Sequence, residues 1–69
     1  MPISGKKAIK ILESNGFTIA RQRGSHVVLT KYVNNKKLTT VVPMHKELKK
    51  GTIRSIAKLS EINPTKFGL

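Results

Sequence analysis

Apolar positions recur at helical spacing near the start of the chain. Four apolar residues form one stripe: Ala8, Ile9, Ile11 and Leu12. Ser4 precedes the stripe and is a favourable N-cap residue. Gly16 follows Asn15 at the other end, where a left-handed residue commonly stops a helix. The pattern predicts a first helix between Ser4 and Gly16.

In the middle of the chain, apolar and polar positions alternate instead. This pattern predicts a three-stranded antiparallel meander. The expected strands are residues 17–21, 25–33 and 36–42. Asn34 and Asn35 separate the last two strands and suit a two-residue turn that needs positive φ angles.

After Pro43 the spacing becomes helical again. The repeat is formed by Ile53, Ile56, Ala57 and Leu59. It predicts a second helix from about Lys50 to Glu61, and Asn63-Pro64 resembles the cap and first position of one more turn, ending near Phe67. The order predicts an α+β fold, α-β-β-β-α, in which two helices cover one face of a three-stranded antiparallel sheet. We expect residues 1–69 to form a single domain.

The asparagine turn decides which side chains share a face of the sheet. It places Val27 opposite Val42 and Leu29 opposite Thr40. The face expected under the helices carries Val27, Leu29, Val33, Leu38 and Val42. The uncovered face carries His26, Val28, Thr30, Tyr32, Lys37, Thr39, Val41 and Pro43. If the strand direction persists past residue 43, His45 is the diagonal neighbour of His26.

The connection before the second strand bears on the same histidine. A three-residue loop, 22–24, with Gly24 left-handed, keeps Phe17 and Ile19 on the covered side, whereas a two-residue 23–24 turn moves them to the histidine side. We therefore expect the longer loop, which holds His26 at a hairpin corner beside two arginines, Arg21 and Arg23.

The net charge of the chain indicates what class of partner it binds. Fourteen Lys and Arg residues against three acidic residues give a net charge of +11 in 69 residues. Such a surface attracts polyanions, chiefly nucleic acid or an acidic protein. Lysines in the first helical turn oppose the helix dipole, so an anionic partner explains them better than helix stability does. The candidates for RNA binding are Lys6, Lys7, Lys10, Arg23, Lys46, Lys49, Lys50 and Arg54.

The chain has no cysteine and no apolar run approaching the roughly 18 residues of a membrane span. We expect a soluble cytoplasmic protein that contacts no membrane. Two histidines and three scattered carboxylates do not form a convincing metal set, and no cofactor motif is present. A sheet that binds RNA through several stacking aromatics is also not favoured, because Tyr32 is the one aromatic residue expected on the open face.

RNA cleavage without a metal needs a base for the 2′-hydroxyl proton, an acid for the leaving 5′-oxygen and cations for the phosphorane. Histidine suits the proton transfers near neutral pH, which makes His26 a candidate. Arg21, Arg23 or Lys46 could supply the charge. An ordinary surface histidine remains the alternative at this point.

Two segments carry a family resemblance: GFTIARQRGSHVVLT and VPMHKELKKGTIRSIAKLSEI. They resemble the HicA-type mRNA interferase toxins, in which a GSH segment opens the second strand and a Pro-x-His segment precedes a helix beginning Gly-Thr-Leu/Ile-Arg. The similarity extends from Ser4 to about Phe67. One departure is Ser60-Glu61, where such toxins commonly have an Ala-Gly pair.

The resemblance implies a fold similar to a double-stranded-RNA-binding domain and an mRNA-cleaving toxin whose active histidine is occluded by a HicB-type antitoxin. It maps the catalytic histidine onto His26, with Gly24 and Ser25 as the turn that presents it. His45 matches a position that is often histidine, and the general acid could be His45, a lysine or water.

Two other readings stay open. One is a non-catalytic RNA-binding domain of the same fold, in which lysines grip phosphates and His26 is one contact. The other is a basic adaptor whose partner is an acidic protein, which explains the charge but not the histidine corner.

Overall fold

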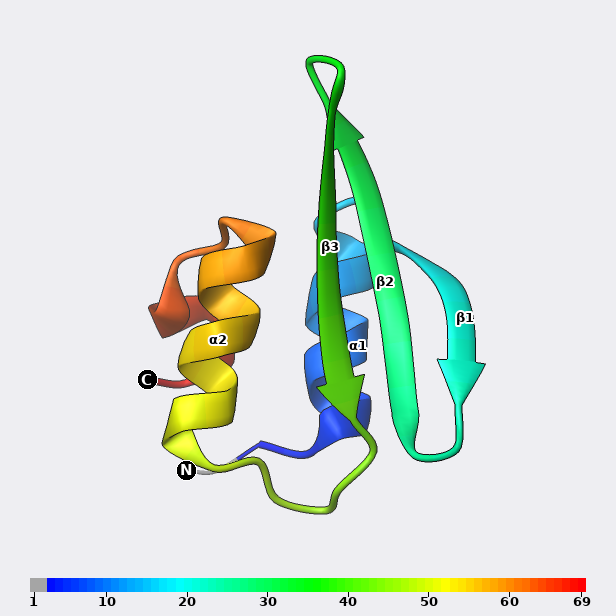
Figure 1. The fold of residues 1–69 in the computed structure, drawn as a ribbon. Coiled ribbons are helices and arrows are strands. Elements are labelled where there is room, and N and C mark those ends of the chain that lie inside the picture. Colours follow the sequence, from blue (N-terminus) through cyan, green and yellow to red (C-terminus); the bar gives the residue numbers. More distant parts are fainter. Residues whose placement is uncertain (1–2) are drawn as a thin grey trace.

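The computed structural model describes residues 3–69 and has the predicted α-β-β-β-α order. The elements are α1 (Gly5–Ser14), β1 (Thr18–Arg23), β2 (His26–Val33), β3 (Lys36–Pro43), α2 (Lys50–Ser60) and the short 3₁₀ helix η1 (Pro64–Phe67). The strands form one antiparallel sheet in the order β1-β2-β3 (Figure 1). The predicted fold class is therefore confirmed.

The ends of α1 follow the local chemistry of the sequence. The Ser4 hydroxyl accepts a hydrogen bond from the Lys7 backbone N–H at 3.0 Å, which satisfies one donor of the first turn. Asn15 ends the helix, and Gly16 adopts a left-handed φ of 92°.

The second helix ends one residue earlier than predicted, because Glu61 is its left-handed C-cap, with φ 59°. Its carboxylate forms an ion pair with the Lys36 ammonium at 2.5 Å. Asn63 then caps η1 by accepting from the Thr65 N–H at 3.0 Å, and Pro64 follows as the first residue, as predicted.

The β2–β3 hairpin has the predicted register. Asn34 and Asn35 have φ angles of 49° and 67°, which the two-residue turn requires. Val27 pairs with Val42 and Leu29 with Thr40.

The predicted three-residue loop of the first hairpin is wrong. Arg23 pairs directly with His26, so the turn consists of Gly24 and Ser25 alone. Gly24 has a φ of 59°, and a glycine with positive φ at the first of two turn positions is typical of a type II′ turn. The extra residue lies instead in β1, where the register shifts between Ile19 and Arg21 in a β-bulge at Ala20.

This bulge keeps Phe17 and Ile19 on the covered side of the sheet, as the longer loop was expected to do. It returns Ile19 to the side of Leu29, and Phe17, just before β1, is buried. The Lys31 ammonium lies 5.9 Å from the centre of the Phe17 ring. Ile19 itself remains 51% exposed on β1, which is one of the two edge strands of the sheet.

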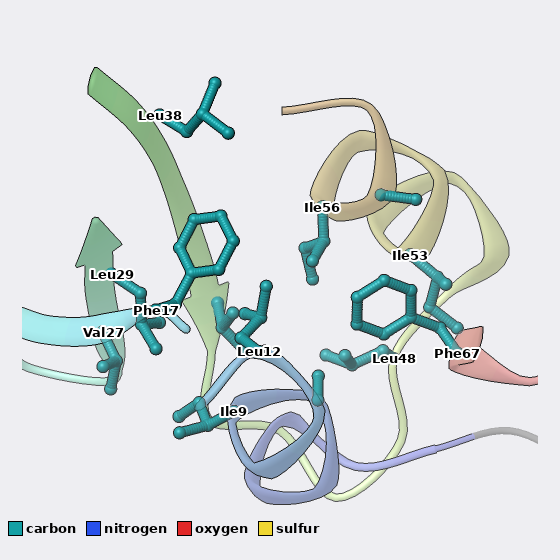
Figure 2. Close-up of a cluster of buried hydrophobic side chains, with 13 residues drawn as sticks. Ile9, Leu12, Phe17, Val27, Leu29, Leu38, Leu48, Ile53, Ile56 and Phe67 are labelled. Carbon is teal, nitrogen blue, oxygen red and sulfur yellow. The ribbon is translucent and has the colours of Figure 1, made fainter. Parts of the chain in front are cut away.

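Both helices and one face of the sheet enclose a single apolar cluster (Figure 2). Its members are Ala8, Ile9, Leu12, Phe17, Val27, Leu29, Leu38, Val42, Leu48, Ile53, Ile56, Ala57 and Phe67. Besides Ile19, two other apolar residues of the predicted covered faces do not join it: Val33 is 36% exposed near the tip of the β2–β3 hairpin, and Leu59 of α2 is 52% exposed. Thr40 is fully buried on the covered face, and its hydroxyl has no hydrogen-bond partner among residues 3–69.

Candidate functional site

One end of the molecule brings together four segments that are distant in the sequence: the start of α1, the β1–β2 turn, the loop after β3 and the start of α2 (Figure 1). Backbone hydrogen bonds join them. The Met44 N–H donates to the Ser25 carbonyl at 2.6 Å, and the Gly5 N–H donates to the His45 carbonyl at 2.9 Å. The Leu48 N–H donates to the Ile3 carbonyl at 2.8 Å.

Eight ionisable residues of these segments form what we call the basic end: Lys6, Lys7, Arg23, His26, His45, Lys46, Lys49 and Lys50. All eight are exposed. Two other predicted RNA-binding residues, Lys10 and Arg54, lie about one helical turn further along α1 and α2 and flank this end.

His26 is the first residue of β2 and lies on the open face of the sheet, which the helices do not cover. Arg23 is directly opposite it on β1, and Pro43 is opposite it on β3. Directly opposed residues of an antiparallel pair have Cβ atoms about 4.5–5.5 Å apart. Arg21 pairs with Val28, one step along the same face. The two-residue turn thus places a guanidinium group across from the imidazole.

His45 reaches the same end by a different route. The β2–β3 ladder continues past Pro43 by one bond, from Met44 to Ser25, and His45 follows it in the exposed loop. In residues 3–69 neither His26 nor His45 makes a side-chain hydrogen bond. The diagonal placement of the two imidazoles stays a prediction.

The electrostatics of the basic end favour anions. Both α1 and α2 begin here, neither has an acidic residue in its first turn, and helix N-termini carry partial positive charge. Glu47 is the acidic residue of the loop. The other two carboxylates belong to Glu13, near the far end of α1, and to Glu61, which is paired with Lys36.

Gly5 is a site-building residue that sequence reasoning missed. A Cβ atom at this position would lie 2.1 Å from the Pro43 carbonyl oxygen, so only glycine lets the start of α1 approach the end of β3. A glycine in the first turn of a helix, where it costs stability, was the available signal.

A comparison with models of protein families identifies the family of this chain. The model of a family described as the HicA toxin of bacterial toxin–antitoxin matches residues 5–62. The chain belongs to the HicA toxin family. This match spans all eight residues of the basic end, and membership in the HicA family implies a cognate antitoxin as partner. No curated protein matches the chain.

Two further observations describe this HicA chain. Within residues 3–69, no three His, Cys, Asp or Glu side chains are grouped so that they could hold a metal ion. No helix in the same residues has the length and apolar character needed to cross a membrane.

Proposed function

We propose that the chain is the toxin of a type II toxin–antitoxin pair and that it cleaves mRNA as a metal-independent endoribonuclease, with His26 as its catalytic histidine. The observation that carries this proposal is the direct pairing of His26 with Arg23 at the basic end of a HicA-family chain. An exposed imidazole beside a guanidinium group, among lysines that lack acidic partners, is suited to chemistry on a phosphodiester.

The chemistry follows from what each group can do. The His26 imidazole accepts the proton of the ribose 2′-hydroxyl, and the 2′-oxygen attacks the adjacent phosphorus. The bond to the 5′-oxygen breaks, which leaves a 2′,3′-cyclic phosphate on one product. The 5′-oxygen takes a proton from His45, a lysine or water. Arg23 and Arg21 stabilise the negative charge of the phosphorane.

The turn before His26 leaves room for RNA to reach the histidine. No atom of the described residues, 3–69, lies within 4 Å of where a Cβ atom of Gly24 would be, so an RNA backbone can approach the turn closely. Ser25, the second turn residue, anchors the corner through its carbonyl, which accepts from Met44. The lysines around this corner hold the phosphates of the flanking nucleotides.

The antitoxin is proposed to be of the HicB type and to cover the corner. Its carboxylates would meet Arg21, Arg23 and Lys46, all of which are exposed. Because these cations are at the rim of the site, they are expected to affect the association rate more than the dissociation rate.

A second candidate is a non-catalytic RNA-binding domain of the same fold, similar to double-stranded-RNA-binding domains. The convergence of two helix N-termini and several lysines at one end supports it, since such an arrangement can grip phosphates without any proton transfer.

The first prediction separates the two candidates. We expect His26→Ala to lower RNA cleavage by about 10²- to 10⁴-fold, the usual contribution of general acid–base catalysis. RNA binding and folding are retained, because the lysines remain and the side chain is exposed. Wild-type products carry 2′,3′-cyclic phosphate or 3′-phosphate ends and form in the presence of EDTA. The measurements are cleavage of an mRNA, chemical mapping of its ends, and circular dichroism.

Lys58→Ala, at the opposite end of α2, is the matched control and should cleave normally. A loss in His45→Ala comparable to that in His26→Ala identifies an acid–base pair, and a small loss leaves the acid role to a lysine or water. Wild-type cleavage by folded His26→Ala would remove the catalytic proposal and leave the RNA-binding domain.

A further inference from the structure

The open face of the sheet continues from the histidine corner to the tip of the β2–β3 hairpin. Strand pairing places on it Arg21, Arg23, His26, Val28, Thr30, Tyr32, Lys37, Thr39 and Val41. The core residues of these strands, such as Val27, Leu29 and Leu38, alternate with them and point toward the helices (Figure 2). Val28 is buried although it lies on the open face. The open face is therefore a continuous strip that leads away from His26.

Tyr32 is the exceptional residue of this strip. It is 72% exposed, so its ring packs on almost nothing in the folded chain. Lys37 lies directly across from it on β3. Tyr32 is six positions after His26 in β2, which corresponds to about 20 Å along the strand at roughly 3.3 Å per residue.

The charge of the strip is of one sign. Arg21, Arg23 and Lys37 lie on it, whereas the three carboxylates of the chain lie on α1, in the loop after β3 and after α2. A polyanion is the complementary partner. An exposed aromatic ring beside a cation favours a polyanion whose bases are free to stack, as in single-stranded nucleic acid.

We propose that the open face binds a single-stranded RNA segment next to the cleaved phosphate, with Tyr32 stacked on one base and Lys37 on a neighbouring phosphate. The inference rests on the proposed ribonuclease function. One ring supplies a single anchor, unlike a sheet that stacks several bases. Thr30 and Thr39, which pair midway along the strip, offer hydroxyl groups to the RNA between the corner and the anchor.

The chain carries its own probe for this contact. Tyr32 is its one tyrosine, and it has no tryptophan. Stacking of a nucleobase on a phenol ring quenches its fluorescence. In a titration of the full-length His26→Ala chain with an unstructured oligouridine, we expect saturable quenching that follows the binding curve from anisotropy of the labelled RNA.

The variants give the size of the effect. Tyr32→Ala should weaken binding of the oligouridine by about 5- to 100-fold, the range that base stacking contributes. Tyr32→Phe keeps the ring and should bind within about twofold of the parent. Affinity for the same oligouridine annealed to its complement should not depend on Tyr32, because the bases of a duplex cannot stack on the ring.

Matched controls come from α2. Leu59→Ala removes another large exposed apolar side chain, and Lys58→Ala removes an exposed lysine for comparison with Lys37→Ala. Neither control should change the affinity for the single strand by more than Tyr32→Phe does. Circular dichroism of every variant shows whether the fold is retained.

Three results overturn the inference: equal single-strand affinity of Tyr32→Ala and its parent, saturation without quenching, or a Tyr32→Ala chain that loses binding to an acidic antitoxin while keeping RNA affinity. If His26-dependent cleavage persists alongside any of these, the proposed function stands and the inference fails. If no RNA is cleaved but single-strand binding requires Tyr32, the open face is an RNA site and the enzymatic proposal fails.

Discussion

In the described part of the chain, the Thr40 hydroxyl lies inside the apolar cluster without a hydrogen-bond partner. A buried polar group left unsatisfied costs about 1–3 kcal/mol, and valine has nearly the same shape. We predict that Thr40→Val raises the free energy of unfolding by about 1 kcal/mol in urea titrations. Thr39→Val, the neighbouring exposed position, should change it by less than about 0.5 kcal/mol. A clear loss of stability in Thr40→Val would contradict this account.

The position of His26 was predictable because one turn determines the face of every residue in β2. Asn34-Asn35 fits a two-residue turn, and side chains alternate strictly along a strand. The direct pairing with Arg23 across the strands was not predictable in the same way. A longer loop and a short turn with a bulge both keep Phe17 on the covered side, and they differ in whether the extra residue lies in the loop or at Ala20. Face patterns alone do not distinguish them.

At the scale of elements, α1 is joined to β3 by a contact that only glycine permits. We predict that Gly5→Ala destabilises the fold by about 1–3 kcal/mol, the usual range for overpacking, because its Cβ would meet the Pro43 carbonyl. Gly51 in the first turn of α2 is the matched control, since no atom of residues 3–69 lies within 4 Å of its Cβ position. Gly51→Ala should stabilise by up to about 1 kcal/mol. Thermal and urea unfolding measure both, and equal effects of the two substitutions would argue against the close approach.

The helices and strands could be predicted from the sequence because the residues that end them act locally. Ser4, Gly16 and Asn63 act within a few residues of their own positions, and each has the predicted role. Glu61 is different. Its left-handed conformation is unusual for glutamate, and its partner Lys36 is distant in the sequence, so no local pattern indicates the pairing.

At the scale of the whole molecule, the charge of +11 is concentrated by the fold, since six of the fourteen Lys and Arg residues belong to the basic end. If lysines there contact phosphates, the logarithm of RNA affinity should fall with the logarithm of salt concentration by about 0.7 per neutralised single-strand phosphate. We predict that joint substitution of Lys49 and Lys50 by Glu weakens binding and makes this slope shallower, as measured by anisotropy at several salt concentrations.

The same charge change made jointly at Lys58 and Lys66, near the other end of α2, is the control and should have a smaller effect. Equal effects of the two pairs would show that net charge matters rather than its location. A slope near zero in the unmodified chain would remove nucleic acid as the partner.

The bonds from Gly5 to His45 and from Ile3 to Leu48 also determine when the corner can exist during synthesis. The start of α1 leaves the ribosome before β3, but its partners are made forty or more residues later, and the core also needs Ile56 and Phe67. A chain whose translation stops before these residues cannot assemble the basic end. If the chain is the proposed ribonuclease, translation products truncated before these residues are therefore expected to be inactive, and an antitoxin meets a complete site only after Phe67 has emerged.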